Sequence, residues 1–394
     1  MHLVRNASEI CVPQADGRGI ERLRGYALLA EAGRITWIGP EPQIPERAGG
    51  AMVHDAGGGA VLPALVDCHT HLVYAGDRIE DFALRAQGAS YADIAARGGG
   101  ILTTVRATRA ASTGDLVAST RRRLEHRRRY GIGTTEVKSG YGLTIEHERR
   151  LLEATALLRG EGWDLEPTLL AAHAVPPDVP REAYVEAICR ELIPEAARRS
   201  LASFVDVFVE RGAYTLDEGR RVLTAAQDAG LGVRIHADQL TQGGGARLAA
   251  ELGAASADHL EHATDDDLAA MARSGVIATL LPGAMIFLGD EGRSLGARAR
   301  AQGVEVAVAT DHNPGSSPLH NLPLAATLAV TQMGLTVEEA IRAVTLGAAR
   351  ALRRPDVGTL TVGSRARWAV LDAPDSRALV YAFGEPIVRE LVEA

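Results

Sequence analysis

The sequence predicts a (β/α)8 barrel of the TIM type, with a small discontinuous β-rich domain built from both termini. Three observations support this prediction. Short β-rich runs alternate with Ala-, Leu- and Arg-rich helical stretches in the middle of the chain, both ends carry β-like runs broken by Gly and Pro, and 394 residues can bury a large core. Strand and helix alternation implies parallel βα units, and eight such units fit in fewer than about 300 residues.

The barrel strands are expected in apolar runs that recur along the middle of the chain and end in polar residues. There are eight of them, at residues 60–71, 133–140, 164–175, 204–212, 232–239, 256–262, 276–283 and 305–315. Helical stretches separate these runs, as a parallel barrel requires.

The two ends of the chain are expected to pair as one small domain. Residues 26–39 and 51–63 near the start, and 357–374 and 386–394 near the end, read as strands with turn residues between them. We therefore assign 1–61 and 352–394 to the β-rich domain and 62–351 to the barrel.

Composition narrows the class of protein. The formal net charge is −8, whereas a nucleic-acid binder is normally basic. The arginine-rich run 121–130 reads as a solvated helix face. No apolar run is long enough to span a bilayer, the first ten residues lack a signal-peptide layout, and three scattered cysteines predict no disulfide framework. These features predict a cytoplasmic protein that binds neither membrane nor nucleic acid.

The clearest chemical signal is the pair His69 and His71 at the end of the first barrel run. In an extended segment, residues i and i+2 project from the same face, so both imidazoles can hold one ion. His236 and Asp311 end two other runs, and the functional face of a parallel barrel lies at the carboxyl ends of its strands. Three imidazoles and a carboxylate favour zinc or iron and leave one coordination position for water. A bound metal lowers the pKa of that water, which makes it a nucleophile near neutral pH.

Several segments together resemble the amidohydrolase superfamily, and within it the imidazolonepropionase family. They are VDCHTHLVYAGDR (66–78), GGGILTTVRATRAAS (98–112), GTTEVKSGYGL (133–143), AAHAVP (171–176), the run from His236 to His262, LLPGA (280–284) and VATDHNPGSSP (308–318). The resemblance extends over nearly the whole chain, from about residue 26 to residue 385.

This resemblance implies a cytosolic hydrolase of the histidine-degradation route. Its reaction converts the cyclic amide 4-imidazolone-5-propanoate to N-formimidoyl-L-glutamate, with one divalent metal, zinc or iron, per subunit. The implied metal ligands are His69, His71, His236 and Asp311. The implied substrate contacts are Arg78, Tyr141, His173, Gln239, Asn313, Gly315 and Ser316.

Residue chemistry supports these roles independently. A propionate requires a cation, and Arg78 can make a bidentate carboxylate contact. Tyr141 lies in a glycine-flanked loop where a hydroxyl can meet substrate. Asn313, Gly315 and Ser316 follow the last barrel run and can present donors.

The general base is left open between Asp311 and His259. Asp311 can hold the metal and take a proton from water, while His259 can serve as a donor to the carbonyl oxygen or as a proton shuttle. Gln239 stands where some relatives carry Glu, and an amide cannot accept that proton. Lys138 is not a ligand in the resembled family, which favours one metal over two.

Two other interpretations stay open. One is another cyclic-amide or nucleobase amidohydrolase or deaminase, which would not need Arg78 as a carboxylate clamp. The other is a non-catalytic metal-binding barrel, which the full set of ligands argues against. The sequence leaves oligomeric state open, with a homodimer as one possibility.

Overall fold

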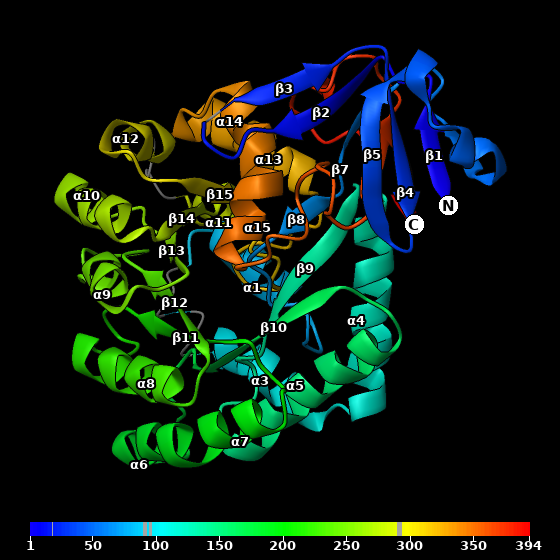
Figure 1. Cartoon of the computed structure of the whole chain (residues 1–394). Coiled ribbons are helices and arrows are strands. Elements are labelled where there is room, and N and C mark those ends of the chain that lie inside the picture. Colours follow the sequence, from blue (N-terminus) through cyan, green and yellow to red (C-terminus); the bar gives the residue numbers. More distant parts are fainter. Residues whose placement is uncertain (18, 90–92, 94–96, 290–293) are drawn as a thin grey trace.

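Eight parallel strands form the central barrel of the protein, in chain order (Figure 1). The computed structural model describes residues 1–17, 19–89, 93, 97–289 and 294–394. The barrel strands are β8 (Leu65–Asp67), β9 (Ile132–Lys138), β10 (Leu165–Ala172), β11 (Phe204–Val209), β12 (Gly232–Ala237), β13 (Ser256–His259), β14 (Ile277–Leu280) and β15 (Val306–Val308). The predicted barrel is confirmed.

The barrel closes just beyond the carboxyl ends of its first and last strands. Thr70 and His312 form a parallel bridge there, outside the named strands. Two backbone hydrogen bonds hold the seam: Asp311 N–H donates to His69 O at 3.1 Å, and His71 N–H donates to His312 O at 2.9 Å. The closure therefore draws together the two segments that carry His69, His71 and Asp311.

Helices surround the barrel on its outside (Figure 1). They are α1 (Ile79–Ala86), α3 (Ile101–Ala110), α4 (Thr113–Arg128), α5 (Ile145–Gly160), α6 (Arg181–Ala187), α7 (Ile193–Arg198), α8 (Leu216–Asp228), α9 (Gly245–Leu252), α10 (Asp265–Ser274), α11 (Pro282–Leu288), α12 (Leu295–Gln302), α13 (Leu322–Met333), α14 (Val337–Arg342) and α15 (Ala348–Ala351). A π-helical turn, Ile188–Leu192, joins α6 to α7, and a second, Ala343–Gly347, joins α14 to α15.

Local sequence explains where four of these helices begin. Capping boxes stand at the start of α4, α8, α10 and α14. In each, the side chain of a Ser or Thr accepts a hydrogen bond from the backbone N–H of an acidic residue three positions later, and the side chain of that acidic residue accepts one from the backbone N–H of the Ser or Thr. Buried Val, Ile, Leu and Ala side chains from the strands and the inner helix faces form the main core. This packing fixes the strand ends on which the site depends.

The predicted β-rich part consists of two further sheets beside the barrel, one made of N-terminal strands alone and one that combines strands of both termini. One has the order β5-β4-β1-β6 and the other β17-β16-β7-β2-β3. Their bounds are β1 (His2–Arg5), β2 (Glu9–Pro13), β3 (Ile20–Leu23), β4 (Tyr26–Glu31), β5 (Arg34–Pro40), β6 (Met52–Asp55), β7 (Ala60–Pro63), β16 (Arg367–Leu371) and β17 (Val388–Glu393). Short 3₁₀ turns span Glu41–Gln43 and Glu46–Gly50, and the short helix α16 (Ala378–Tyr381) precedes β17.

The first predicted barrel strand is in fact two strands in different sheets. Residues 60–63 form β7, which pairs antiparallel with β16, and only Leu65–Asp67 form barrel strand β8. Both pieces are fully buried and, apart from Asp67, apolar, so hydrophobic pattern alone does not separate them.

The arginine-rich run is not simply a solvated face. Arg127 is 1% exposed and pairs with Asp67 inside the protein. Arg123 lies over the Tyr74 ring, 3.6 Å from its centroid, and donates to the Leu72 and Tyr74 carbonyls. These arginines anchor α4 to the end of β8 and to the segment after it, so the expectation of a solvated face was wrong for this part of the run.

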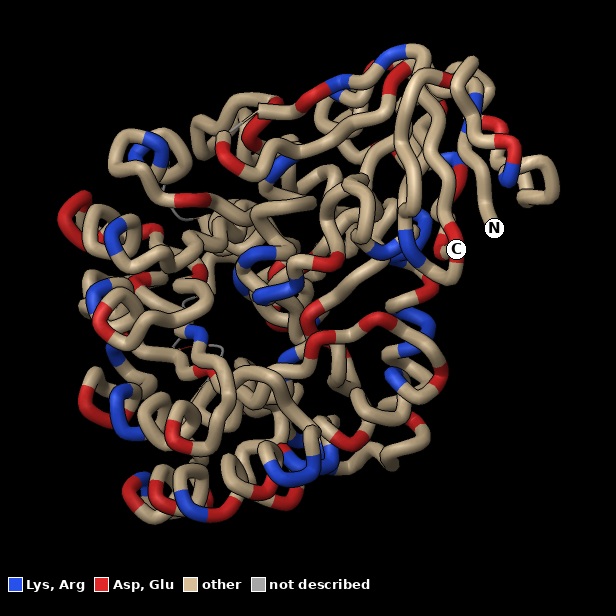
Figure 2. The backbone as a smooth tube through the Cα atoms, viewed as in Figure 1, with Lys and Arg blue, Asp and Glu red and all other residues tan. Residues whose placement is uncertain are grey.

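Basic and acidic residues are interspersed along the outer helices (Figure 2). Many pair with each other, for example Arg121 with Glu161 and Arg221 with Glu182. Among the described helices, none combines the length and apolar character needed to cross a membrane.

Candidate metal centre and substrate cavity

Four predicted ligands converge at the carboxyl end of the barrel. The Asp311 Oδ1 atom lies 3.4 Å from His69 Nε2 and 3.3 Å from His71 Nε2. His236, near the end of β12, places Nε2 at 3.4 Å from His71 Nε2. Ligand atoms bound to one tetrahedral ion at about 2.0–2.1 Å are about 3.4 Å apart, so the spacing of His69, His71 and Asp311 fits a single ion, and His236 lies beside it.

Unpaired buried atoms at this point support the same interpretation. His69 Nε2 and Asp311 Oδ1 are shielded from solvent and have no hydrogen-bond partner among the described residues. A buried polar atom left without a partner costs about 1–3 kcal/mol, so such atoms are rare without a functional reason. A divalent ion between them would satisfy both, and the donor set suits zinc or iron.

A carboxylate behind His69 orients that ring. Asp258 Oδ2 accepts a hydrogen bond from His69 Nδ1 at 2.6 Å, which leaves the Nε2 lone pair free for an ion. Burial alone would raise the pKa of Asp258, but the neighbouring Arg234 and His69 hold that pKa well below its usual range. Asp258 is thus an acceptor only, and it fixes the tautomer.

His236 has a similar carboxylate behind it. The Asp206 Oδ2 atom lies 3.0 Å from His236 Nδ1. Burial lowers the pKa of His236 to about 3, so its ring is neutral and able to bind a metal. Lys138 Nζ donates to Asp206 at 2.8 Å and to Glu136 at 2.7 Å, so it serves as a counter-ion in this network.

We expect Asp258→Asn to weaken metal binding about 10- to 100-fold, because the His69 ring loses its carboxylate support. Competition with a chelator measures the affinity. The matched control is Asp164→Asn, which removes a carboxylate that pairs with Arg354 and Arg367 at the opposite end of the barrel. The control should lower the melting temperature without changing metal affinity, and equal affinity losses in both variants would contradict the prediction.

His259 lies beside this cluster. It ends β13 with a φ of +79° and is 2% exposed. His69, His236 and His259 form one group, and His69, His71 and Asp311 another, in each of which the ligand atoms lie within 4.8 Å of one another. The His259 Nδ1 atom has no hydrogen-bond partner among the described residues, with Glu261 Oε1 3.7 Å away. His259 is therefore free to act on a group bound at the cluster.

A cavity of about 450 Å³ opens onto the cluster. It contains every residue that was predicted to contact substrate: Arg78, Tyr141, His173, Gln239, Asn313, Gly315 and Ser316. His71, His236, His259 and Asp311 also line it, so any molecule in the cavity would meet the proposed metal site. The roles of these lining residues in binding substrate and metal stay predictions.

Two of these residues have well-defined local surroundings. His173 Nδ1 donates to the Gly140 carbonyl at 3.0 Å, and the His173 ring stacks on His71 with centroids 5.0 Å apart. Gly140 has a φ of +113°, and a Cβ there would lie 2.8 Å from His173 Nδ1, so only glycine fits. Tyr141 is 4% exposed, and burial raises the pKa of its hydroxyl well above the usual value, which keeps it a donor.

The loop after β15 is held by its own side chains. Asn313 Oδ1 accepts from the backbone of Gly315 at 2.8 Å and of Ser316 at 2.7 Å, and its amide donates to Asp311 O at 2.7 Å. The Asn313 side chain thus shapes the loop and positions Asp311, a role that the sequence did not indicate.

Sequence reasoning missed several other residues that line the cavity. They are Asp81, Arg85, Ile101, Phe208, Leu240 and Leu288. Arg78 pairs with Asp81, so its guanidinium already has a carboxylate neighbour. Arg85 lies in α1, seven positions after Arg78, which caps the start of that helix, and the sequence carried no signal that set it apart from a surface arginine.

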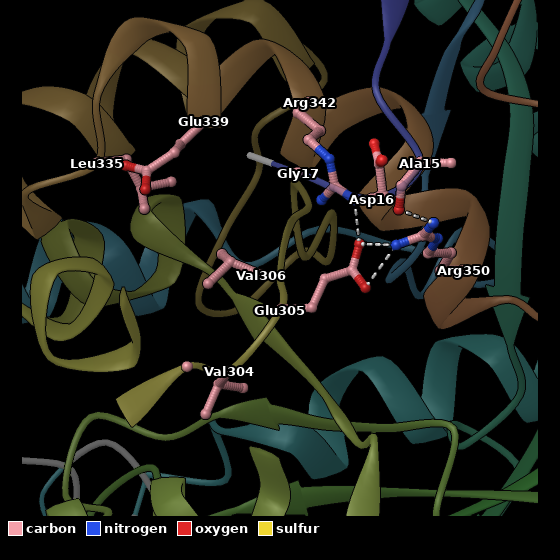
Figure 3. A pocket seen from close by; sticks show the side chains of 11 residues that line it. Ala15, Asp16, Gly17, Val304, Glu305, Val306, Leu335, Glu339, Arg342 and Arg350 are labelled. Atoms are coloured by element: carbon pink, nitrogen blue, oxygen red, sulfur yellow. Dashed lines mark hydrogen bonds and ion pairs between the residues drawn. The ribbon is translucent and has the colours of Figure 1, made fainter. Parts of the chain in front are cut away.

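A second cavity, of about 280 Å³, lies at the opposite end of the barrel (Figure 3). Its charged groups pair with one another: Glu305 contacts Arg342 at 2.7 Å and Arg350 at 2.8 Å. Arg350 also donates to the Ala15 carbonyl at 2.6 Å. The contacts around this cavity join the N-terminal segment to the barrel. Among the described residues, no cluster of candidate metal ligands lines it.

Comparison with known proteins identifies the family of this chain. The model of the amidohydrolase family matches residues 60–391, which is most of the chain. The chain belongs to the amidohydrolase family. It is 50% identical over 351 residues to an imidazolonepropionase of Anaeromyxobacter dehalogenans, covering 87% of this chain and 83% of that protein. An imidazolonepropionase of Deinococcus deserti is 47% identical over 377 residues, covering 96% and 93%.

Solved structures of a hydrolase and a deaminase share the fold. A triazine hydrolase variant matches with a TM-score of 0.76 at 18% identity, covering 100% of this chain and 93% of that one. An adenosine deaminase from Xanthomonas campestris, solved with bound zinc, matches with a TM-score of 0.72 at 18% identity, covering 100% and 91%. The sequence match thus shows the family, and these structures show the same fold.

Proposed function

We propose that the chain hydrolyses 4-imidazolone-5-propanoate to N-formimidoyl-L-glutamate. The strongest support for this proposal is the 47% identity to an imidazolonepropionase over nearly the full length of both chains. The cavity supports the same substrate, because it combines the candidate metal ligands with a basic wall that suits a carboxylate.

One divalent ion, zinc or iron, would be held by His69, His71, His236 and Asp311. The support is the ligand spacing and the unpaired buried atoms His69 Nε2 and Asp311 Oδ1. Such an ion, when bound, supplies Lewis-acid chemistry that activates water and polarises a carbonyl. Lys138, tied to two carboxylates, is not available as a second-metal ligand, which favours one ion.

The protein groups then act on protons and on orientation. The second carboxylate oxygen of Asp311 accepts a proton from the attacking water and passes it to the ring nitrogen as the C–N bond breaks. His259 is placed to stabilise charge on the carbonyl oxygen. Gln239 lines the cavity and orients water or substrate through its amide.

His173 and Tyr141 hold the ring. The His173 Nδ1 donates to Gly140 O, and burial lowers the pKa of the ring, so Nε2 is an acceptor for a substrate N–H. The Tyr141 hydroxyl stays protonated and donates. Arg78 binds the propionate, and Gly315 and Ser316 line the same cavity.

A direct assay tests this function. The purified holoenzyme is mixed with 4-imidazolone-5-propanoate, and loss of the ring absorbance is followed together with formation of N-formimidoyl-L-glutamate. Guanine, adenosine and cytosine serve as counter-substrates for the nucleobase alternative. We expect turnover of the imidazolone only, whereas turnover of a nucleobase with none of the imidazolone would contradict the proposal.

We further expect a cytoplasmic enzyme. Three reduced cysteines, two of them buried, suit a reducing compartment. A homodimer stays a prediction, which light scattering on the full chain tests.

A further inference from the structure

Arg85 lies on the wall of the substrate cavity, next to the proposed carboxylate clamp. It is on α1, two turns after Arg78, and both arginines line the cavity. Arg85 Nη2 donates to the Gly315 carbonyl at 3.2 Å, and a Cβ on Gly315 would lie 3.2 Å from Arg78 Nη1. The two guanidinium groups therefore approach the same point of the loop after β15.

The charges of this wall do not balance. Asp81 pairs with Arg78 and also accepts from the backbone of Gly100 at 2.9 Å. Among the described residues, no carboxylate pairs with Arg85. Two guanidinium groups and one carboxylate leave a net charge of about +1, which one substrate carboxylate would neutralise.

The hydrogen-bonding capacity of Arg85 is also unfilled. Its bond to Gly315 uses one of five N–H donors, and its buried Nε atom has no acceptor within the described part of the chain. Arg85 is partly buried, and a partly buried guanidinium without a directly paired anion is costly, so an anionic partner is expected there.

Aromatic packing holds the Arg85 side chain in place. Its guanidinium lies over the Phe287 ring, 5.0 Å from the centroid, and Phe287 in turn stacks on Phe82 with centroids 5.0 Å apart. A stacked arginine is already ordered, so less conformational entropy is lost when it binds a carboxylate.

We propose that Arg85 is the second cation of the carboxylate subsite and acts with Arg78 to hold the propionate of the substrate. Asp81 orients Arg78 and cancels one of the two positive charges. This inference rests on the proposed function for the identity of the substrate, but the selectivity it predicts concerns any ligand that carries the carboxylate.

The test compares a carboxylate with its neutral amide. Calorimetry measures the binding of imidazole-4-propanoate and of imidazole-4-propanamide to the holoenzyme, for the wild type, Arg85→Met and Arg85→Lys. The matched control is Arg221→Met, which removes an arginine that pairs with Glu182 on the outside of α8. Melting curves and metal content establish that each variant is folded and loaded, and Arg85→Lys serves if Arg85→Met does not fold.

A charge-assisted hydrogen bond is worth enough to change the dissociation constant about 10- to 100-fold. We expect Arg85→Met to weaken binding of the carboxylate by that factor and binding of the amide by less than about threefold. Arg85→Lys should have an intermediate effect, and Arg221→Met should bind both ligands as the wild type does. Equal weakening of both ligands, or no weakening of the carboxylate, would overturn the role of Arg85. A wild type that selects the carboxylate but does not hydrolyse the imidazolone would refute the proposed function and leave this inference standing.

Discussion

Replacing Asp311 by Asn is expected to lower kcat about 100- to 10,000-fold while the barrel stays folded. The amide has the same shape and can still accept through one oxygen, but it cannot take a proton from water, and general-base catalysis contributes about 10²- to 10⁴-fold. The same change removes the negative charge that faces His69 and His71 at 3.4 and 3.3 Å, so metal affinity falls as well.

Three measurements separate these effects. Turnover is measured at saturating zinc or iron, metal content on the same sample, and the fold by circular dichroism. His259→Gln is the comparison, because it tests the other candidate base, and it should retain more activity than Asp311→Asn. A loaded Asp311→Asn variant with near-normal kcat would remove Asp311 from proton transfer.

Arg78→Ala gives the second large effect, a loss of about 100- to 1,000-fold in kcat/KM for the propionate substrate. Removing one member of a buried charge pair costs about 2–5 kcal/mol, because the other charge is left unpaired. Here Asp81 would keep its hydrogen bond from Gly100 but lose its cationic partner, and its negative charge would repel the carboxylate of the substrate. The loss should therefore exceed that of Arg85→Met, which leaves no such anion behind.

The double variant Arg78→Ala/Asp81→Asn tests this explanation. Asparagine keeps an oxygen to accept from Gly100 but removes the charge, so the double variant should recover part of the lost kcat/KM. Steady-state kinetics on the propionate substrate measures the recovery. A double variant that is worse than Arg78→Ala would show that repulsion from Asp81 is not the cause.

The sequence was sufficient for the barrel because its strands are short buried runs with polar ends, and Ala-, Leu- and Arg-rich helical stretches separate them. It failed at residues 60–67, where one continuous apolar run serves two sheets. Hydrophobic pattern reports burial and not the partner strand, and β7 is assigned to the terminal sheet only by its pairing with β16.

The candidate site was predictable where spacing or motif carried it. His69 and His71 share a face by strand periodicity, and Asp311 meets them because the barrel closes at that seam. The supporting carboxylates Asp258 and Asp206 were not predicted, because their contacts join different strands. Arg85 was missed for a similar reason, since an arginine on an amphipathic helix reads as surface until the cavity beside it is known.

Metal content measured together with turnover tests the central claim most directly. The wild type and the four variants His69→Ala, His71→Ala, His236→Ala and Asp311→Ala are each dialysed against a limiting chelator, and bound zinc and iron are measured on the same samples as imidazolone hydrolysis. The account predicts one ion per wild-type chain and parallel loss of ion and activity in all four variants. Full activity in a preparation without metal, or a variant that loses its ion but keeps its turnover, would contradict it.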